Sequence, residues 1–411
     1  MIGFRKGKGI TSVDISNSRI RVIVARKKKE KDIDILAAEE DSLSSVNRSI
    51  VTDLNQTAQA LKDILYRIKR NSHIDNHYIY LNISGSHLDM TTSHGAVMIK
   101  NSKHQVRQED IDNVIMSAHV QGVSLDRTPI HSLACGYTID EQDRVLNPIN
   151  MQAEKLEVDL SIISSLSNHI KNLRKSVNQA GYEVREFIAS AIASSHSVLT
   201  EEEKRSGVIL MDIGAGVTDL AFFKDNYLKG FKVLSKGGND ITSLLSDKLK
   251  ISLSYAEEIK KRYGCIYLEK QEMAEDIILK DANSNFKNIT RSQICNIIKE
   301  GLMYLFSEIK TALRKMDCLR QAPVGIVITG GAGLLDGLIE KAQEEFNLPV
   351  RLGLPREPRV LKNLNSPGWS TCLGMAKYVL FKEETPFYNP PKPTLLSYIK
   401  RKIEILFTDY F

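Results

Sequence analysis

Apolar residues near the start of the chain recur first at every second position and then at helical spacing. From Ile10 to Arg26 the alternation, interrupted at Ser16-Asn17-Ser18, predicts two strands joined by a tight hairpin. Tyr78 to Ile83 forms a further predicted strand, so the chain opens as an α/β domain. The intervening predicted helix follows Asp53 and is marked by apolar residues three and four apart: Leu54, Ala58, Leu61, Ile64, Leu65 and Ile68.

The pattern changes between about Gly85 and Leu160. Short polar strands, a helix beginning near Gln108 and two polar loops predict a small inserted α+β domain. After it the α/β alternation returns, with a strand to Ser165, a helix to about Ala180 and a strand over 183–188.

Residues 207–223 form a second strand, turn and strand that repeat the plan of residues 9–25 at a separation of about 200 residues, which indicates an internal duplication. A mostly helical stretch is predicted from Ile241 to about Met316, followed by a buried strand from Val324 to Thr329. The tail after Phe381 is rich in proline, which favours an extended linker, and residues 394–411 return to helical spacing.

Composition restricts the class of protein but does not indicate an activity. The 411 residues suggest two to four subdomains, and 56 basic against 50 acidic residues are too evenly balanced to indicate nucleic-acid binding. Five scattered cysteines without a CxxC pair predict reduced thiols, and the histidines form no zinc-type motif. The basic N-terminus lacks the apolar core of a secretory signal, and no apolar run is long enough to span a bilayer.

The strongest chemical motif is Asp212-Ile-Gly-Ala-Gly-Val-Thr-Asp219, a carboxylate at the end of a buried strand followed by a glycine turn. Gly214 and Gly216 allow the backbone to approach a polyphosphate, Thr218 is a candidate donor to it, and Asp212 is a candidate to hold Mg²⁺ through water. The alternative is an ordinary β-hairpin with this turn chemistry.

Two further elements extend this motif. Asp14, with Ser16, Asn17 and Ser18, occupies the equivalent hairpin of the first half and is a second candidate for water-mediated Mg²⁺ binding. Thr329 ends a buried strand and is followed by Gly330, Gly331 and Gly333, which are predicted to open a helix beside the phosphates of a nucleotide. We therefore expect the two hairpins and this turn to converge on one bound ATP.

These elements, in this order, resemble the actin, Hsp70 and sugar-kinase superfold, and nearly the whole chain resembles the bacterial cell-division family FtsA. The matching segments are Val106 to Asp112, Ala193 to Glu201, the Asp212 motif, Gly237 to Thr242, Ala256 to Gly264 and Ser370 to Gly374. The resemblance implies that Gly237, Gly238 and Asn239 lie near the nucleotide and that Glu257 and Lys260 contact its ribose. Without the resemblance, Glu257 and Lys260 would be interpreted as a solvated ion pair on one helix.

The implied fold is α/β: a two-lobed actin/Hsp70-like fold with a duplicated βββαβα core, an inserted α+β subdomain termed 1C, and a C-terminal amphipathic helix. The expected domains are subdomain 1A over 1–84, 163–204 and 361–384, subdomain 1C over 85–162, and subdomains 2A/2B over 205–360. A linker over 385–393 and a membrane-targeting helix over 394–411 complete the chain.

Two features qualify this expectation. The first phosphate loop carries Ser16-Asn17-Ser18 where the family usually has a glycine; asparagine tolerates left-handed turns, but backbone contact to the β-phosphate is expected to weaken. Glu186 is the candidate that would activate water for ATP hydrolysis, with a charge at the edge of the core as the equal alternative. ATP binding is therefore predicted, and efficient turnover is not.

The C-terminal segment predicts membrane contact. Its basic residues Lys400, Arg401 and Lys402 crowd one side, which suits anionic lipid, whereas docking on the parent domain is the alternative. Its apolar residues recur three and four apart: Leu395, Leu396, Ile399, Ile403, Leu406, Phe407 and Tyr410.

The resemblance implies a cell-division protein, primarily structural rather than enzymatic, that self-assembles at the division site on the cytoplasmic face of the inner membrane. Its implied partners are the C-terminal peptide of FtsZ, further copies of itself, anionic lipids and, through the inserted subdomain, later division proteins; no nucleic acid is expected. The alternatives are a pilus-assembly actin homologue and a small-molecule kinase of the same superfold.

Overall fold

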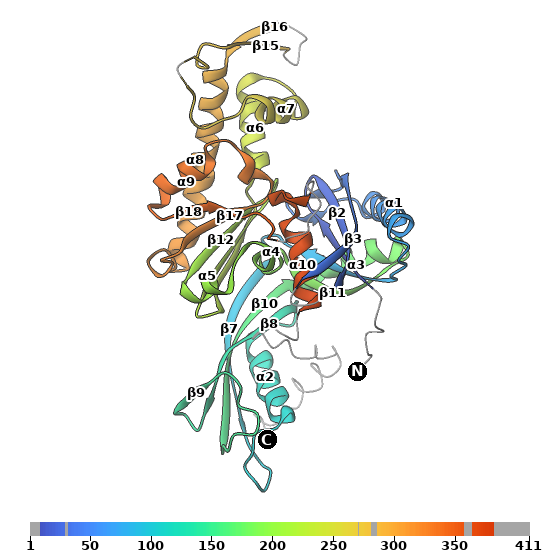
Figure 1. Ribbon diagram of the computed structural model, residues 1–411, viewed down its shortest axis with the longest axis vertical. Helices are drawn as coiled ribbons and strands as arrows, with labels where there is room; N and C mark the ends of the chain where they lie inside the picture. Colours follow the sequence, from blue (N-terminus) through green and yellow to red (C-terminus); the bar gives the residue numbers. More distant parts are fainter. Residues whose placement is uncertain (1–8, 29–31, 270, 281–285, 357–363, 382–411) are drawn as a thin grey trace. The chain divides into compact units, whose positions relative to one another are not determined.

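The computed structural model describes residues 9–28, 32–269, 271–280, 286–356 and 364–381 (Figure 1). These residues form two compact units. The first contains residues up to 86, 171–226 and 230–381, and the second contains 87–170 with 227–229.

The first unit contains two five-stranded sheets that share one plan. In each sheet a central strand pairs antiparallel with the next strand in sequence and parallel with a later one. One has the order β3-β2-β1-β6-β11: Ile33–Ser42, Arg19–Lys27, Ile10–Ile15, Tyr78–Ile83 and Glu183–Ala189. The other has the order β14-β13-β12-β17-β18: Tyr227–Leu234, Thr218–Lys224, Val208–Ile213, Gly325–Thr329 and Val350–Leu352. The predicted duplication is therefore confirmed.

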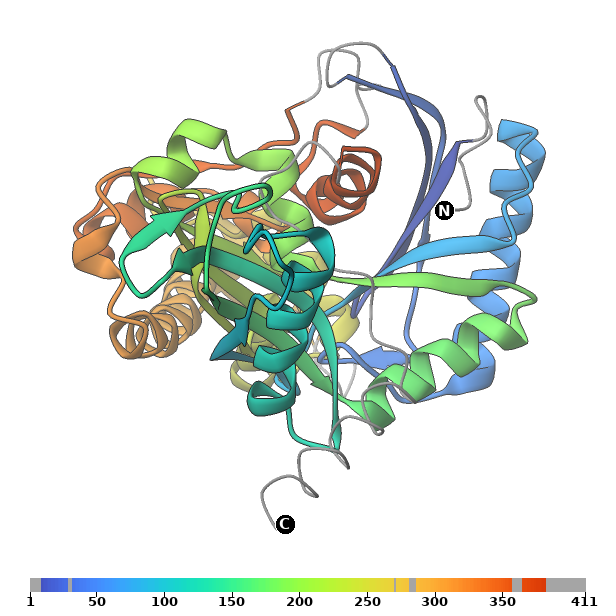
Figure 2. The same ribbon diagram turned by 90° about the horizontal axis from the view of Figure 1, so that it is seen from below.

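Helices cover both faces of the first sheet. Helix α1 (Leu54–Ser72) begins at Asp53, whose side chain accepts a hydrogen bond from the Gln56 amide, and it buries the predicted apolar stripe against β2 and β3. Helix α10 (Ser370–Leu380) contacts β1 and β2 from the other face, as Figure 2 shows. It also packs closely against α4 (Ser190–Val198).

The predicted mostly helical stretch contains α6 (Gly238–Leu249), α7 (Leu253–Tyr263) and α8 (Arg291–Lys315). It also contains an unpredicted antiparallel hairpin, β15 (Asp276–Lys280) and β16 (Phe286–Thr290). The hairpin buries Ile277, Leu279 and Ile289, but Ile278 and Phe286 are apolar and exposed, so the sequence does not show a clear alternation of apolar and polar residues. The shorter elements of the unit are β4 (Val46–Asn47), β5 (Ile50–Val51), α3 (Ser167–Gln179), α5 (Glu201–Ser206), α9 (Leu338–Phe346) and the 3-10 helices η1 (Leu319–Gln321), η2 (Gly331–Leu334) and η4 (Pro367–Trp369).

The second unit is the inserted α+β domain. Its sheet has the order β7-β10-β8-β9: Leu88–Met98, Lys155–Leu166, Arg127–Ile139 and Asp143–Val145. Helix α2 (Gln108–Gly122) packs on β7 and β10, and apolar side chains of both form a separate core. Three of the strands are longer than the short polar strands predicted: β8 and β10 are buried over most of their length, and β7 alternates between buried and exposed positions.

Within the described part of the chain, no helix is long and apolar enough to cross a bilayer. The predicted linker over 385–393 and amphipathic helix over 394–411 lie outside the described residues.

Candidate functional site

Three carboxylates meet where the two central hairpins of the first unit come together. Asp14 is the penultimate residue of β1, and Asp212 holds the same place in β12. Asp219 lies opposite Asp212 in the β12–β13 hairpin. All three are buried, at 4%, 8% and 3% exposure. The structure therefore brings together the two acidic hairpins that the sequence analysis placed at one site.

The carboxylates affect one another's ionisation. Burial raises the pKa of Asp14 to about 6, and the nearby charge of Asp212 adds to this effect. Burial also raises the pKa of Asp212 to about 6, and it raises the pKa of Asp219 well above the usual range with a further contribution from Asp212. Arg21 opposes the shift at Asp14, with its guanidinium 3.6 Å from the carboxylate. A second positive charge at this cluster would therefore stabilise the ionised forms.

Three further residues of this site, Asn82, Ser84 and Asp219, were not predicted from the sequence. The Ser84 hydroxyl lies 2.7 and 2.8 Å from the two oxygens of Asp219. The Asn82 side chain accepts a hydrogen bond from the Ile15 amide at 2.7 Å, which fixes the end of β1 to β6. Hairpin register could have placed Asp219 opposite Asp212, and polar residues at the carboxyl end of a parallel strand could have indicated Asn82 and Ser84.

The glycine-containing loops pack around these carboxylates. The amides of Gly238 and Asn239 donate to the carbonyls of Gly214 and Ala215 at 3.0 and 2.7 Å. Gly330 has a φ of 86°, and a Cβ there would lie 2.5 Å from an Asp212 oxygen, so only glycine fits. The Asp212 loop, the Gly237 turn and the Gly330 turn therefore form one continuous cluster.

Two details of the predicted phosphate contacts need correction. Thr218 is fully buried, and its hydroxyl donates to the Lys236 carbonyl at 2.9 Å, so it braces the loop and is not free to donate to phosphate. The turn after Thr329 opens the single 3-10 turn η2, whereas α9 begins only at Leu338. Gly333 is buried and its amide donates to Gly330, but the space beside the Gly331 α-carbon is open, so its backbone is the accessible one.

Glu186 lies apart from the cluster. It sits on β11 in register with Tyr80 of β6, and β11 is two strands from β1, or roughly 10 Å. Its charge acts on Tyr80 but is not among the causes that shift the pKa values of the three carboxylates. The structure therefore does not bring the predicted water-activating residue to the site.

Glu257 and Lys260 of α7 form a partly buried network rather than a solvated pair. Their charged groups lie 2.6 Å apart, and the Lys260 side chain is only 14% exposed. The Lys260 ammonium also donates to the Gly238 carbonyl at 3.0 Å and to the Thr242 hydroxyl at 2.7 Å. The pair is thus tied directly to the glycine turn.

The donor set suits a cation held through water. Among the described residues, no three histidine, cysteine or acidic side chains are arranged to bind a metal directly. Asp14 and Asp212 are nevertheless buried acids, and among the described residues Arg21 is the cation whose charge lowers their pKa values. Because Mg²⁺ usually keeps several water ligands and binds few carboxylates, these residues fit the predicted water-mediated Mg²⁺.

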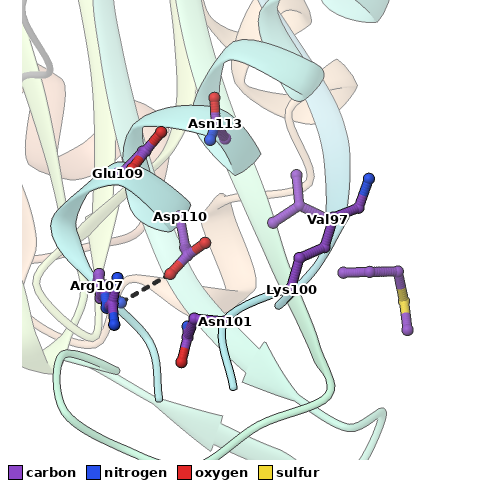
Figure 3. A pocket seen from close by; sticks show the side chains of 8 residues that line it. Val97, Lys100, Asn101, Arg107, Glu109, Asp110 and Asn113 are labelled. Atoms are coloured by element: carbon purple, nitrogen blue, oxygen red, sulfur yellow. Dashed lines mark hydrogen bonds between the residues drawn. The ribbon is translucent and has the colours of Figure 1, made fainter. Parts of the chain in front are cut away.

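The second unit has a separate hollow of about 500 Å³ between the end of β7 and the start of α2 (Figure 3). Its lining carries charges of both signs, and the Asp110 carboxylate accepts the Arg107 backbone N–H at 2.8 Å. A mixed, open lining of this kind is typical of a protein contact surface rather than a small-molecule pocket.

Sequence comparison places the chain among cell-division proteins. Residues 209–374 match the family described as "Cell division protein FtsA", and residues 85–164 match the "SHS2 domain inserted in FTSA". The Cell division protein FtsA of Pseudomonas aeruginosa is 28% identical over 98% of this chain and 99% of its own length. That of Borreliella burgdorferi is 28% identical over 96% of each chain.

Solved structures share the actin-like fold at low sequence identity. The type IV pilus biogenesis complex PilM-PilN matches with a TM-score of 0.66 and 14% identity, over 90% of this chain and 98% of that one. MreB5 of Spiroplasma citri bound to ADP matches with 0.55 and 14%, over 93% and 98%. The MamK double helical filament matches with 0.51 and 12%, over 90% and 99%.

These likenesses in structure establish only the fold, but the two matched FtsA segments cover more than half of the chain and the full-length relatives carry the same name. The chain belongs to the FtsA family of cell-division proteins.

Proposed function

We propose that this protein binds ATP with Mg²⁺ at the cluster of Asp14, Asp212 and the three glycine turns. The observation that carries the proposal is the convergence of two buried acidic hairpins with the open backbone at Gly331. In this arrangement Asp14 and Asp212 hold the hydrated Mg²⁺, which neutralises the phosphates and the buried acids together. The backbone at Gly214, Gly216 and Gly331 approaches the phosphates, while Glu257 and Lys260 contact the ribose.

We propose that nucleotide binding serves assembly rather than catalysis. The protein forms actin-like polymers on the cytoplasmic face of the inner membrane at the division site, and anchors the FtsZ ring there. Family membership supports the division role, and the filament of the fold neighbour MamK supports self-assembly. The position of Glu186 away from the cluster supports weak hydrolysis at most.

Within this proposal the inserted unit recruits later division proteins, and the hollow between β7 and α2 is a candidate contact surface for them. The tail over 394–411 binds anionic lipid, and the C-terminal peptide of FtsZ docks on the second half of the first unit. A pilus-assembly role is less well supported, because PilM shares only the fold whereas the FtsA relatives match along the chain.

The nucleotide site is tested by Asp212→Asn, which removes one buried charge while keeping the side-chain shape. We expect Mg²⁺-ATP affinity, measured by calorimetry, to fall at least tenfold with little change in the melting temperature. Asp225→Asn is the matched control, because Asp225 is an exposed acid in the β13–β14 turn whose φ of 56° asparagine accepts. Unchanged ATP binding by Asp212→Asn would rule out this site.

The division role is tested by co-sedimentation of the full chain with anionic vesicles, ATP and FtsZ. We expect FtsZ to pellet with vesicles only when the full chain is present, and an FtsZ lacking its C-terminal peptide to stay in the supernatant. FtsZ that remains soluble in every mixture would contradict the anchoring role, and phosphoryl transfer to sugars or acetate would favour the kinase alternative.

A further inference from the structure

The side chain of Asn17 fills the space between the two hairpin turns of the first unit. It projects from the β1–β2 turn onto the backbone of Gly216 in the β12–β13 turn. A Cβ at Gly216 would lie only 2.0 Å from Asn17 Nδ2 and 2.4 Å from its Cγ. The amide group therefore occupies the volume directly over Gly216, where a bound phosphate would approach that backbone.

The backbone conformation of the β1–β2 turn does not require asparagine at position 17. The described non-glycine residues with positive φ do not include Ser16, Asn17 or Ser18, so the expected left-handed conformation is not used. The backbone would accept alanine at position 17 without strain. What distinguishes asparagine here is its carboxamide.

A second segment holds that carboxamide in place. Asn17 Oδ1 accepts a hydrogen bond from the Ser49 amide at 2.8 Å. Ser49 and Arg48 form the two-residue turn between β4 and β5, with φ values of 61° and 47°. Such a turn favours asparagine and glycine, so with Arg and Ser it depends on outside contacts. Asn17 supplies one, and Asp240 at the start of α6 supplies another, 3.5 Å from the Arg48 guanidinium.

We propose that the Asn17 side chain is a built-in occupant of the polyphosphate position, held by Ser49, and that nucleotide binding must displace it. The inference rests on the proposed ATP site and adds to it a residue that sets affinity. Displacement breaks the Asn17–Ser49 hydrogen bond and releases the β4–β5 turn. The protein therefore binds nucleotide less tightly than its loops alone would allow, and binding loosens a surface turn.

The test is Asn17→Ala, which removes the carboxamide without adding glycine flexibility. We expect ATP and ADP to bind about five- to tenfold more tightly, the equivalent of one hydrogen bond no longer broken. AMP and adenosine, which lack the β-phosphate, should bind as they do to the original chain. Asn17→Asp keeps the shape but adds a negative charge, and should weaken ATP and ADP binding at least tenfold.

Hydrogen exchange of peptides covering residues 43–53 gives a readout independent of affinity. In the original chain, ATP should increase exchange in this segment, because the Ser49 amide loses its acceptor. In Asn17→Ala the exchange should be high without ATP, and ATP should not raise it further.

The outcomes separate this inference from the proposed function. If the original chain binds ATP and Asn17→Ala binds it equally well or more weakly, then Asn17 is a ligand or a bystander. In that case only the inference fails. If neither form binds ATP, the proposed function fails and the inference falls with it. Equal tightening for AMP would also overturn it, because the effect would not depend on the β-phosphate.

Discussion

The chemistry of this protein at the scale of single residues depends on acids and polar groups held out of water. Asp14, Asp212 and Asp219 are each more than nine-tenths buried, and burial is the largest cause of their raised pKa values. A buried group of this kind is costly unless something compensates its charge. In the proposed function that compensation comes from Mg²⁺, which explains why the cluster lies where glycine turns allow a ligand to approach.

In the second unit, burial has the opposite effect on a base: it lowers the pKa of His119 of α2. His119 is 2% exposed, and neither ring nitrogen has a hydrogen-bond partner among the described residues. Burial lowers its pKa from 6.5 to about 4. Between these values the unfolded chain binds a proton that the folded chain does not, so stability is lost as the pH falls from about 6.5 to about 4.

We therefore expect His119→Leu to reduce the acid sensitivity of the inserted unit. At pH 5.5 the original chain should lose about 1 kcal/mol of its unfolding free energy, because His119 binds a proton only in the unfolded state. The variant should not show this loss. Hydrogen exchange of α2 and β7 in the full chain, compared at pH 7.5 and 5.5, measures this difference. An equal pH response in the variant would mean that His119 is not the group responsible.

At the scale of elements, the contact between α4 and α10 links the fold to the site. Small residues line it, and a Cβ at Gly374 would lie 1.9 Å from the Ala193 carbonyl oxygen. The same two helices supply hydroxyl groups to the site: Thr371 lies 3.1 Å from Asp212, and Ser190 accepts a hydrogen bond from Asn82. Close packing of α4 on α10 therefore positions the carboxylate cluster.

Gly374→Ala should separate the two helices. We expect a loss of about 2–3 kcal/mol of stability from overpacking against backbone that cannot yield, with weaker ATP binding because Thr371 shifts. Chemical denaturation and calorimetry measure the two effects. Gly331→Ala is the matched control for stability only, since an added Cβ there meets nothing within 4 Å. A Gly374→Ala variant as stable as the original chain would show that the contact is looser than described.

At the scale of the whole molecule, the described residues combine a duplicated core with an inserted domain. The core brings its two acidic hairpins together because each half contributes one equivalent turn. The insert has its own apolar core, which allows it to present a separate contact surface. The proposed membrane contact belongs to residues 394–411, outside the described part of the chain.

Replacing Leu396, Ile399 and Phe407 with glutamate should release the protein from membranes. Burial of this apolar face provides most of the proposed lipid binding, so we expect the triple glutamate variant to stop floating with anionic vesicles while its melting temperature is unchanged. The control introduces the same charges at polar positions, Thr394, Ser397 and Thr408, and should retain most of the binding. Full flotation of the first variant would contradict the anchor.

The sequence by itself determined the kinds and order of most elements. The hairpin at Ile10 to Arg26, helix α1 and the repeat near residue 208 follow from hydrophobic periods of two and 3.6, which are local properties of the chain. The glycine motifs likewise indicated the turns later found around Asp212. The β15–β16 hairpin was missed because its exposed positions include the apolar residues Ile278 and Phe286, which hide the period of two.

Only the tertiary structure decided which side chains meet. It brought Asp219, Asn82 and Ser84 to the cluster, turned the Thr218 hydroxyl toward Lys236, and left Glu186 on a strand away from Asp14. It also placed Asn17 over Gly216, almost 200 residues further along the chain. Such contacts depend on how distant segments pack, and local periodicity carries no information about the distance between residues on different elements.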